Sequence, residues 1–202
     1  MIVALLRHGS THWNESGRMQ GRCDVPLSAL GRTQVLRWRM PPGIGAPLRW
    51  LSSPLARAVE TARLVGGTEP VCVPALVEMD WGEWEGRTLA ALDAEFGDAF
   101  RRNAAAGLDF RPPGGESPRE VRARALRWLQ ALPRVAGTTV AVTHNGVIRA
   151  LLSAATGWDM TGKPPLRLKR DALHRFGVVD GRIALVEANV QLLPDAAAAQ
   201  QG

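Results

Sequence analysis

The sequence predicts an α/β protein: a three-layer sandwich in which helices flank a central, mainly parallel sheet, with one antiparallel hairpin near the C-terminus. Short apolar runs that suit buried strands alternate with longer segments that have helical apolar spacing. The last two strand-like segments are separated by Asp180-Gly181, a pair typical of a hairpin turn. The chain has 202 residues, 46% hydrophobic and 22% charged, which suits one soluble domain of this kind.

The N-terminal part of the chain is expected to contain two strands and one helix. Ile2–Leu6 is a short apolar run that suits a buried strand, and a polar, turn-rich loop follows it over residues 7–26. Ser28 suits the N-cap of a helix that runs to about Met40, where two prolines and a glycine stop it. Leu48–Ser52 is the second predicted strand.

The middle of the chain is expected to contain two helices on either side of an irregular stretch. Ser53 is expected to cap a helix whose first residue is Pro54, the position that favours proline. Its apolar residues recur every three or four positions until Gly66-Gly67 ends it. The segments that follow are a short strand at Val71–Val73, an irregular stretch over 74–87, and a helical stretch from Thr88 to about Ala106, interrupted near Gly97.

The C-terminal part is expected to complete the alternation of helices and strands. Ser117-Pro118-Arg119-Glu120 is a capping box with proline at the first helical position, which predicts a helix to about Leu132. Thr139–Thr143 is the clearest strand. The other expected elements are a Pro/Gly loop over 107–115, a helix from Gly146 to about Ala155, and hairpin strands at Leu173–Val178 and Arg182–Glu187.

These elements are expected to form a single domain over residues 1–193, with a small helical insertion around 88–115 and a flexible tail over 194–202. No apolar run reaches the ~18 residues that span a bilayer. The run Ile2–Leu6 is too short for the core of a signal peptide. We therefore expect a cytoplasmic protein without a membrane partner, whose two cysteines stay reduced and form neither a disulfide framework nor a zinc site.

The positive charge of the chain indicates small anionic ligands rather than nucleic acid. The formal net charge is +6, and only Lys163 and Lys169 among the 25 basic residues are lysines. Arginine presents a planar set of donors that suits phosphate and carboxylate groups. The arginines are scattered, several lie beside acidic residues, and no basic block is interleaved with aromatic residues. Nucleic-acid binding is therefore not expected.

Two histidines lie where a parallel sheet places its ligands, outside the carboxyl ends of strands. His8 follows the first predicted strand and His144 follows the clearest one. Arg7 adds positive charge beside His8, and Gly9 can let the backbone approach an anion closely. Arg57 lies in the first turn of a predicted helix, which favours anions. Taken singly, each also has a structural interpretation: a surface arginine or a hydrogen-bonded core histidine.

Taken together, these motifs resemble the histidine phosphatase superfamily, the phosphoglycerate-mutase-like proteins. The resemblance follows the family's order from Leu5 to Leu152. It covers LLRHGSTHWN (5–14), MQGRCDVPLSALGRTQ (19–34), SSPLARAVETA (52–62), LVEMDWGEWEG (76–86), GGES (114–117) and VTHNGVIRALL (142–152). The sequence departs from the family pattern at Ser10, where the family commonly has Glu or Gln, and at Asn145, where it usually has glycine.

The resemblance implies a role for each matching residue. His8 would be the nucleophile that takes up the phosphoryl group, and Glu78 would be the proton donor, although Asp80, Glu83 and Glu85 lie close by in the sequence. The residues implied to contact the phosphoryl oxygens or border their pocket are Arg7, Gly9, Asn14, Gln20, Arg57, His144 and Asn145. The roles of Trp81 and Trp84, core packing or pocket wall, stay open at this point.

The resemblance implies a metal-independent phosphomonoesterase without a cofactor, acting on a small phosphorylated metabolite, with α-ribazole phosphate as one candidate. The chain is expected to be a monomer or a homodimer. A phosphoglycerate mutase is the alternative, and a non-catalytic protein that binds phosphorylated ligands is a further one. The phosphatase is favoured over the mutase because the segment between Gly86 and Gly114 is short. A dinuclear metal hydrolase would need aspartates at ligand positions beside the histidines, which the sequence lacks.

Overall fold

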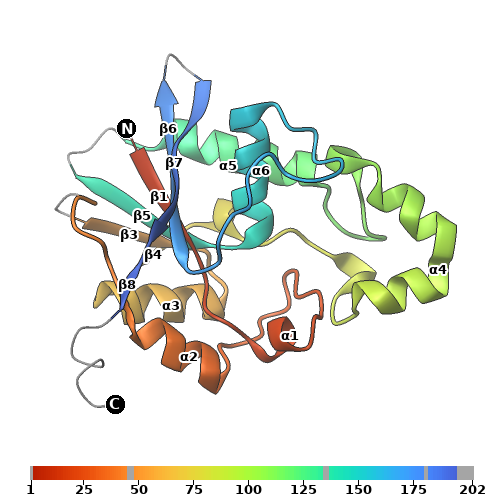
Figure 1. Ribbon diagram of the computed structural model, residues 1–202, viewed down its shortest axis with the longest axis horizontal. Coiled ribbons are helices and arrows are strands. Elements are labelled where there is room, and N and C mark those ends of the chain that lie inside the picture. The colour runs from red at the N-terminus through yellow and green to blue at the C-terminus, as the bar shows by residue number, and fades with distance from the viewer. Residues whose placement is uncertain (1, 45–47, 134–136, 180–181, 195–202) are drawn as a thin grey trace.

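A twisted, six-stranded sheet forms the centre of the molecule, as the computed structural model in Figure 1 shows. The structure describes residues 2–44, 48–133, 137–179 and 182–194. Within these residues the strand order is β4-β3-β5-β1-β6-β7. The strands are β1 (Ile2–Arg7), β3 (Leu48–Ser52), β4 (Val71–Cys72), β5 (Thr138–Thr143), β6 (Ala172–Val179) and β7 (Arg182–Gln191).

The sheet is mainly parallel, as the sequence predicts. β1, β3, β4 and β5 are parallel, whereas β6 pairs antiparallel with β1 and β7 pairs antiparallel with β6. The predicted hairpin is therefore confirmed, although its turn at residues 180–181 lies outside the described residues. The carboxyl ends of β1 and β5 lie side by side, since Arg7 is in register with Thr143. This register brings the two candidate histidines to one edge of the sheet.

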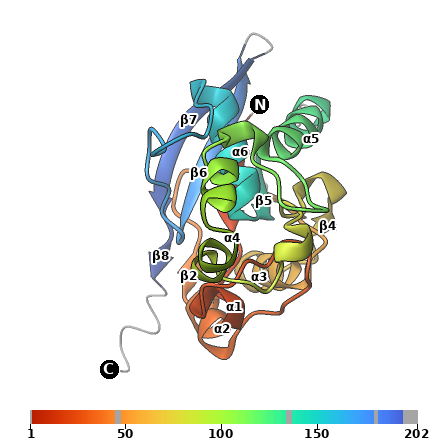
Figure 2. The ribbon, with the colours of Figure 1, turned by 90° about the vertical axis from the view of Figure 1, so that its right-hand side faces the viewer.

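Helices cover both faces of the sheet (Figure 2). α5 (Pro118–Ala131) and α6 (Asn145–Thr156) cover one face, and α2 (Ala29–Leu36) and α3 (Ala56–Gly66) lie on the other. β1 is buried on both faces: Val3 and Leu5 pack into the first layer, and Ala4 and Leu6 pack into the second. Full burial of each such leucine contributes roughly 1.5–3 kcal/mol. The carboxyl end of β1 is therefore held in place from both sides.

The helix that the sequence places after Ser28 is shorter than predicted. Ser28 is its N-cap, because its Oγ accepts a hydrogen bond from the N–H of Gly31 at 2.9 Å. The helix ends at Leu36, and the next residues form β2 (Trp38–Arg39), which pairs with β8 (Leu193–Pro194). Pairing with a segment from the far end of the chain therefore takes precedence over helical continuation. The remainder of the predicted tail, 195–202, lies outside the described residues.

Ser53 does not cap α3, contrary to the prediction. The helix begins at Ala56 with Leu55 at the N-cap position, and the side chain of Leu55 cannot accept a hydrogen bond. The N–H of Ala56 donates instead to Oδ1 of Asp24, at 2.7 Å. The Oγ of Ser53 lies 2.7 Å from Nε2 of His144. The same Oγ accepts the N–H of Leu55 at 3.3 Å, so Ser53 contacts both the residue before the helix and the end of the neighbouring strand β5. The predicted end of the helix is confirmed by Gly67, which has φ 64°.

The remaining helices follow their sequence signals closely. α4 (Leu89–Ala104) is broken at Gly97, which has φ 49° and ψ −123°, as predicted. The capping box of Ser117 and Glu120 is formed at the start of α5. The turn-rich regions also contain the short helices α1 (His12–Glu15), η1 (Pro74–Leu76), η2 (Gly82–Trp84) and η3 (Gly107–Asp109).

α4 extends away from the sheet (Figures 1 and 2), in the region where the sequence predicts an insertion. A single domain over 1–193 stays a prediction. In the described part of the chain, no helix combines the length and the apolar character needed to cross a bilayer.

Candidate active site

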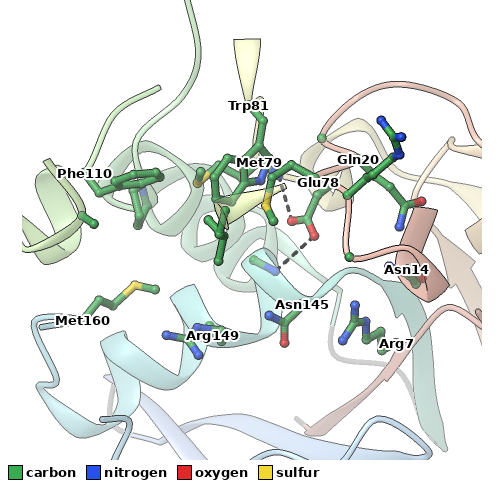
Figure 3. A pocket seen from close by; sticks show the side chains of 18 of the residues that line it. Arg7, Asn14, Gln20, Glu78, Met79, Trp81, Phe110, Asn145, Arg149 and Met160 are labelled. Carbon is green, nitrogen blue, oxygen red and sulfur yellow. Dashed lines mark hydrogen bonds between the residues drawn. The ribbon is translucent and has the colours of Figure 1, made fainter. Parts of the chain in front are cut away.

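A cavity of about 700 Å³ opens at the carboxyl ends of the parallel strands. Its inner end holds polar and charged groups, and Figure 3 shows how the labelled side chains surround it. Several buried polar atoms of the site have no hydrogen-bond partner among the described residues. They are Nε of Arg7, Oε1 of Gln20, Nε of Arg57, Nδ1 of His144 and Nε of Arg170. Because buried polar groups are normally paired, this concentration indicates a site built for a polar ligand.

His8 is oriented by the end of β1. Its backbone N–H donates to the carbonyl of Thr143 at 3.0 Å, and its side chain is 2% exposed. Nδ1 lies 2.6 Å from the carbonyl oxygen of Gly9, so Nδ1 carries the proton and Nε2 keeps its lone pair. Burial, together with the charges of Arg7 and Arg57, holds the pKa of His8 well below its usual value. The imidazole is therefore neutral at physiological pH, as a nucleophile must be.

His144 lies beside His8 but is not among the residues that line the cavity. The ring centroids are 5.0 Å apart and the planes are inclined at 56°. His144 is fully buried, and its Nε2 faces the Oγ of Ser53 while its Nδ1 has no partner in the described part of the molecule. Burial, and secondly the nearby His8, keeps its pKa well below the usual value. The structure therefore brings together the two histidines that the sequence separates by more than a hundred residues.

Arg57 is fully buried, so the interpretation as a surface arginine is wrong. Its two terminal nitrogens each donate at 2.8 Å, one to the carbonyl of Cys23 and the other to that of Gly21. Glu85 holds this loop, because its carboxylate accepts the N–H groups of Arg22 and Cys23 at 2.6 and 2.9 Å. Burial lowers the pKa of the Arg57 guanidinium.

Arg7 is the second guanidinium predicted for the site, and the structure places it on the wall of the cavity (Figure 3). Burial lowers its pKa to about 10, and repulsion by Arg170 acts in the same direction. A pKa of about 10 keeps the group charged at neutral pH. Arg7 and Arg57 thus present positive charge around His8.

Glu78 is the carboxyl group that reaches the cavity. Its two oxygens accept hydrogen bonds from the N–H of Met79 at 2.9 Å and from the N–H of Gly146 at 3.3 Å (Figure 3). A Cβ at position 146 would lie 2.3 Å from Oε1 of Glu78, so glycine is required for this approach. Burial raises the pKa of Glu78, and this outweighs the opposing effect of the two N–H groups and the arginines.

The neighbouring acids do not compete with Glu78 for the cavity. Glu85 holds the 22–23 loop, Asp80 caps the N–H of Gly82 at 2.8 Å, and Glu83 is exposed. None of the three lines the cavity.

The other predicted binding residues are divided by the structure. Asn14, Gln20 and Asn145 line the cavity. Gly9 does not: its N–H donates to Oγ1 of Thr61 at 3.0 Å, and a Cβ there would lie 2.4 Å from Val35. The prediction that Gly9 approaches an anion is therefore not supported by its position. Close packing against α2 accounts for a glycine at this position.

Three arginines of the cavity were missed by sequence reasoning: Arg18, Arg149 and Arg170. Arg18 donates from its guanidinium to the carbonyl of Gly86 at 2.8 Å. Arg170 precedes β6, and its Nη1 donates to Oγ of Ser10 at 3.2 Å. The only signal in the sequence is Ser10 itself, which departs from the family pattern. Arg149 follows Asn145 by four residues on α6, a spacing that places both on one helix face.

The structure also separates the two tryptophans. Trp81 lines the cavity and packs against Phe110, whereas Trp84 is 5% exposed and belongs to an apolar cluster with Leu92 and Phe100. Trp81 is therefore a wall of the cavity and Trp84 a core residue. The described residues contain no group of three or more His, Cys, Asp or Glu side chains placed to hold a metal ion.

A neutral histidine at the end of a central parallel strand, facing arginines and a protonatable carboxyl group, defines a class of α/β enzymes that act on phosphoryl groups. The comparison with known families agrees with this class. The family model of the histidine phosphatase superfamily (branch 1) matches residues 3–191, and the chain belongs to this family.

Relatives within the family include both phosphatases and mutases. A glucosyl-3-phosphoglycerate phosphatase of Mycobacterium tuberculosis is 35% identical over 180 residues, which cover 81% of this chain and 79% of the relative. A 2,3-bisphosphoglycerate-dependent phosphoglycerate mutase of Gloeobacter violaceus is 33% identical over 166 residues, covering 75% and 74%. The structure of a mycobacterial glucosyl-3-phosphoglycerate phosphatase in complex with VO3 has a TM-score of 0.78 at 30% identity, covering 94% of this chain and 99% of that one.

Proposed function

We propose that this protein is a phosphomonoesterase that hydrolyses a small phosphorylated metabolite through a phosphohistidine intermediate on His8. The observation that carries the proposal is the state of His8. Its ring is neutral, its Nδ1 is engaged by the carbonyl of Gly9, and its Nε2 is free to attack. Arg7 and Arg57 lie around it, and Glu78 lines the same cavity.

In the first step, Nε2 of His8 attacks phosphorus and the bond from phosphorus to the ester oxygen breaks. Glu78 donates its proton to the departing oxygen, so an alcohol leaves rather than an alkoxide. In the second step the Glu78 carboxylate takes a proton from water, whose oxygen attacks phosphorus. The P–N bond then breaks and inorganic phosphate is released. Arg7, Arg57 and Nδ1 of His144 are the groups available to stabilise the negative charge on the transferring phosphoryl oxygens.

The raised pKa of Glu78 and the lowered pKa of His8 are both in the direction that this sequence of steps requires. His8 must be neutral to attack, and Glu78 must be protonated to donate. A bound phosphate dianion adds like charge near Glu78 and raises the pKa of its carboxyl group further. The same carboxyl group then serves as base once the alcohol has left.

The relatives favour hydrolysis over mutase chemistry. The M. tuberculosis relative is a phosphatase, and the aligned mycobacterial phosphatase structure holds VO3, a small oxyanion. A phosphoglycerate mutase is the second candidate, because the G. violaceus relative bears that name. We propose a cytoplasmic location, in which Cys23 and Cys72, unpaired among the described residues, stay reduced. We place the enzyme there as a monomer or homodimer without a nucleic-acid or membrane partner.

The decisive experiment is rapid quenching of the enzyme after brief reaction with a ³²P-labelled phosphomonoester. We expect label on His8 that is labile in acid and stable in alkali, and one inorganic phosphate released for each ester consumed. Acid-stable label would contradict a histidine nucleophile. Label transferred between carbons of phosphoglycerate, with little free phosphate, would show a mutase. No label and no turnover would show a non-catalytic phospho-ligand-binding protein.

Replacement of Glu78 by glutamine is expected to reduce turnover most for esters with poor leaving groups. A proton donor contributes about 10²–10⁴-fold. We expect a loss in this range for an alkyl phosphate and a much smaller loss for p-nitrophenyl phosphate, whose leaving group needs little protonation. Because the first step needs protonated Glu78, wild-type kcat/KM should fall as pH rises through its raised pKa, and the E78Q variant should lose that limb.

The measurement is a pair of pH profiles for the two esters. On the acid side, His8 stays neutral well below pH 6.5, so activity should persist there until the pH falls through its lowered pKa. Equal losses for both esters in E78Q would contradict the role as proton donor.

A further inference from the structure

The cavity extends from the phosphoryl site into an outer chamber with apolar walls. We use the term outer chamber for the part of the cavity lined by Met79, Trp81, Leu89, Phe100, Phe110 and Met160. Figure 3 shows Met79, Trp81 and Phe110 on one side and Met160 on the opposite side, with open space between them. None of these side chains carries a charge, and the ring N–H of Trp81 is the one strong hydrogen-bond donor among them, so the chamber offers mainly apolar contact to a leaving group.

Arg18 and Arg149 also line the cavity, and the guanidinium of Arg18 already donates to the carbonyl of Gly86 at 2.8 Å. Arg149 lines the cavity between Asn145 and Met160, and its guanidinium carbon lies 4.9 Å from the centre of the Trp158 ring. Within the described residues, no carboxylate or carbonyl group is hydrogen bonded or ion paired to it. Burial is the cause that lowers its pKa. A partly buried guanidinium with five donors and no protein acceptor is a candidate partner for an anionic group of a ligand.

The wall that holds Arg149 is fixed by its own contacts. Trp158 donates from its ring N–H to the carbonyl of Thr161 at 2.9 Å, and the carbonyl of Asp159 accepts the N–H of Leu108 at 2.8 Å. Met160, between them, has φ 68°, a left-handed conformation that is unfavourable for a side chain with a Cβ. Strain of this kind is kept where surrounding structure demands it. These hydrogen bonds therefore fix the positions of Trp158 and Met160 in the cavity wall.

We propose that the outer chamber binds the leaving group of the substrate and that Arg149 binds an anionic group on it. The substrate class is a phosphomonoester whose leaving group has an apolar ring or chain and carries one carboxylate or similar anion. Arg149 lies four residues beyond Asn145 on α6, a backbone rise of about 6 Å, so the second anion is expected on the side of the cavity away from the phosphoryl end. This inference rests on the proposed function, because it takes the inner end of the cavity as the phosphoryl site.

The test compares esters that differ only in the second anion: phenyl phosphate, 3-carboxyphenyl phosphate and 4-carboxyphenyl phosphate, with glucose 6-phosphate as a hydroxylated leaving group. A hydrogen bond to a charged group corresponds to about a 10- to 100-fold difference. We expect the wild-type kcat/KM to be higher by that factor for the better carboxyphenyl ester than for phenyl phosphate. Glucose 6-phosphate should be the poorest of the four, and 3- and 4-sulfophenyl phosphate show whether any anion suffices.

Arg149→Met should lower kcat/KM for the carboxyphenyl ester about 10- to 100-fold and remove the preference for the carboxyl group, with a much smaller loss for phenyl phosphate, because the lost charge pair involves the charged ester. Arg149→Lys should keep part of the preference. Arg102→Met, at an exposed position of α4, is the matched control and should keep all of it. Unfolding midpoints of the three variants separate misfolding from lost recognition.

Two results would overturn the inference. An equal loss for phenyl and carboxyphenyl phosphate in Arg149→Met would mean that Arg149 contacts the phosphoryl group instead. A wild-type preference for glucose 6-phosphate would mean that the chamber does not select apolar leaving groups. Failure of the proposed function has a different signature, since no ester would then be turned over. Calorimetry with phenylphosphonate and carboxyphenylphosphonate still measures the contribution of Arg149 in that case.

Discussion

Replacement of His8 by alanine is expected to reduce the turnover of p-nitrophenyl phosphate by about 10⁴-fold or more, the scale seen when a covalent nucleophile is removed. The loss should be in kcat, and labelled enzyme should no longer form. The physical reason is that, of the described residues, His8 alone combines a free imidazole nitrogen with a position on the wall of the cavity among the arginines. Steady-state kinetics and ³²P labelling measure both effects.

The control for this substitution is His12→Ala. His12 lies on α1 near the same loop but its side chain is 73% exposed, so its removal should leave turnover within a factor of about two. Retention of label in His8→Ala would show another nucleophile, and His144, whose ring is 5.0 Å away, would be the first to examine. Such a result would overturn the assignment of His8 and leave the family membership intact.

Replacement of Arg57 by alanine is expected to impair both catalysis and folding. Loss of one preorganised donor to the transition state costs about 10²–10³-fold in kcat. The fold should also lose about 2–4 kcal/mol, since two carbonyl groups in the 21–23 loop would be left without their donors inside the protein. An interpretation from sequence alone, in which Arg57 lies at the surface, would predict an effect on turnover with little effect on stability. Because Arg57 is buried, we expect its replacement to lower the stability of the fold as well.

Kinetics and denaturant unfolding of the same Arg57→Ala preparation measure the two effects separately. Arg63→Ala is the matched control on α3, because its side chain is 55% exposed and forms a surface ion pair with Glu69, which is 65% exposed. It should change neither stability nor turnover appreciably. An unchanged unfolding midpoint in Arg57→Ala would show that the loop carbonyls find other donors, and an unchanged kcat would remove Arg57 from the phosphoryl site.

The charges of the site explain why a dianion is the ligand that suits it. Arg7, Arg57 and Arg170 lie around His8. Burial is the main cause that lowers the pKa of Arg7, and repulsion by Arg170 and Arg57 acts in the same direction. Glu78 is the carboxyl group that lines this cavity, and burial favours its protonated form. Positive charge is therefore held in place before the ligand arrives. Binding of a phosphate dianion would relieve this repulsion and pair the free N–H groups.

Local sequence signals determined much of the fold. The buried strand at the N-terminus, the caps at Ser28 and Ser117 and the break at Gly97 all depend on residues within a few positions of one another. Periodicity and capping act through the backbone of the same segment, so they can be read without knowing the partner segments. The sequence also predicts that His8 and His144 lie close together, because each follows a strand and parallel strands place their carboxyl ends at one edge of the sheet.

Only the tertiary structure decided which polar groups face the cavity. Ser53 contacts His144 and does not occupy the N-cap position. Trp38 pairs with the C-terminal segment where the sequence predicts a helix, and Gly9 packs against α2. Arg170 enters the site from a segment outside the recognised motifs, and Arg149 lies within VTHNGVIRALL (142–152) without a role implied for it. In each case a contact between distant parts of the chain replaces or adds to a local one. The free energy of such a contact depends on what lies across the sheet or the cavity, which local spacing does not encode.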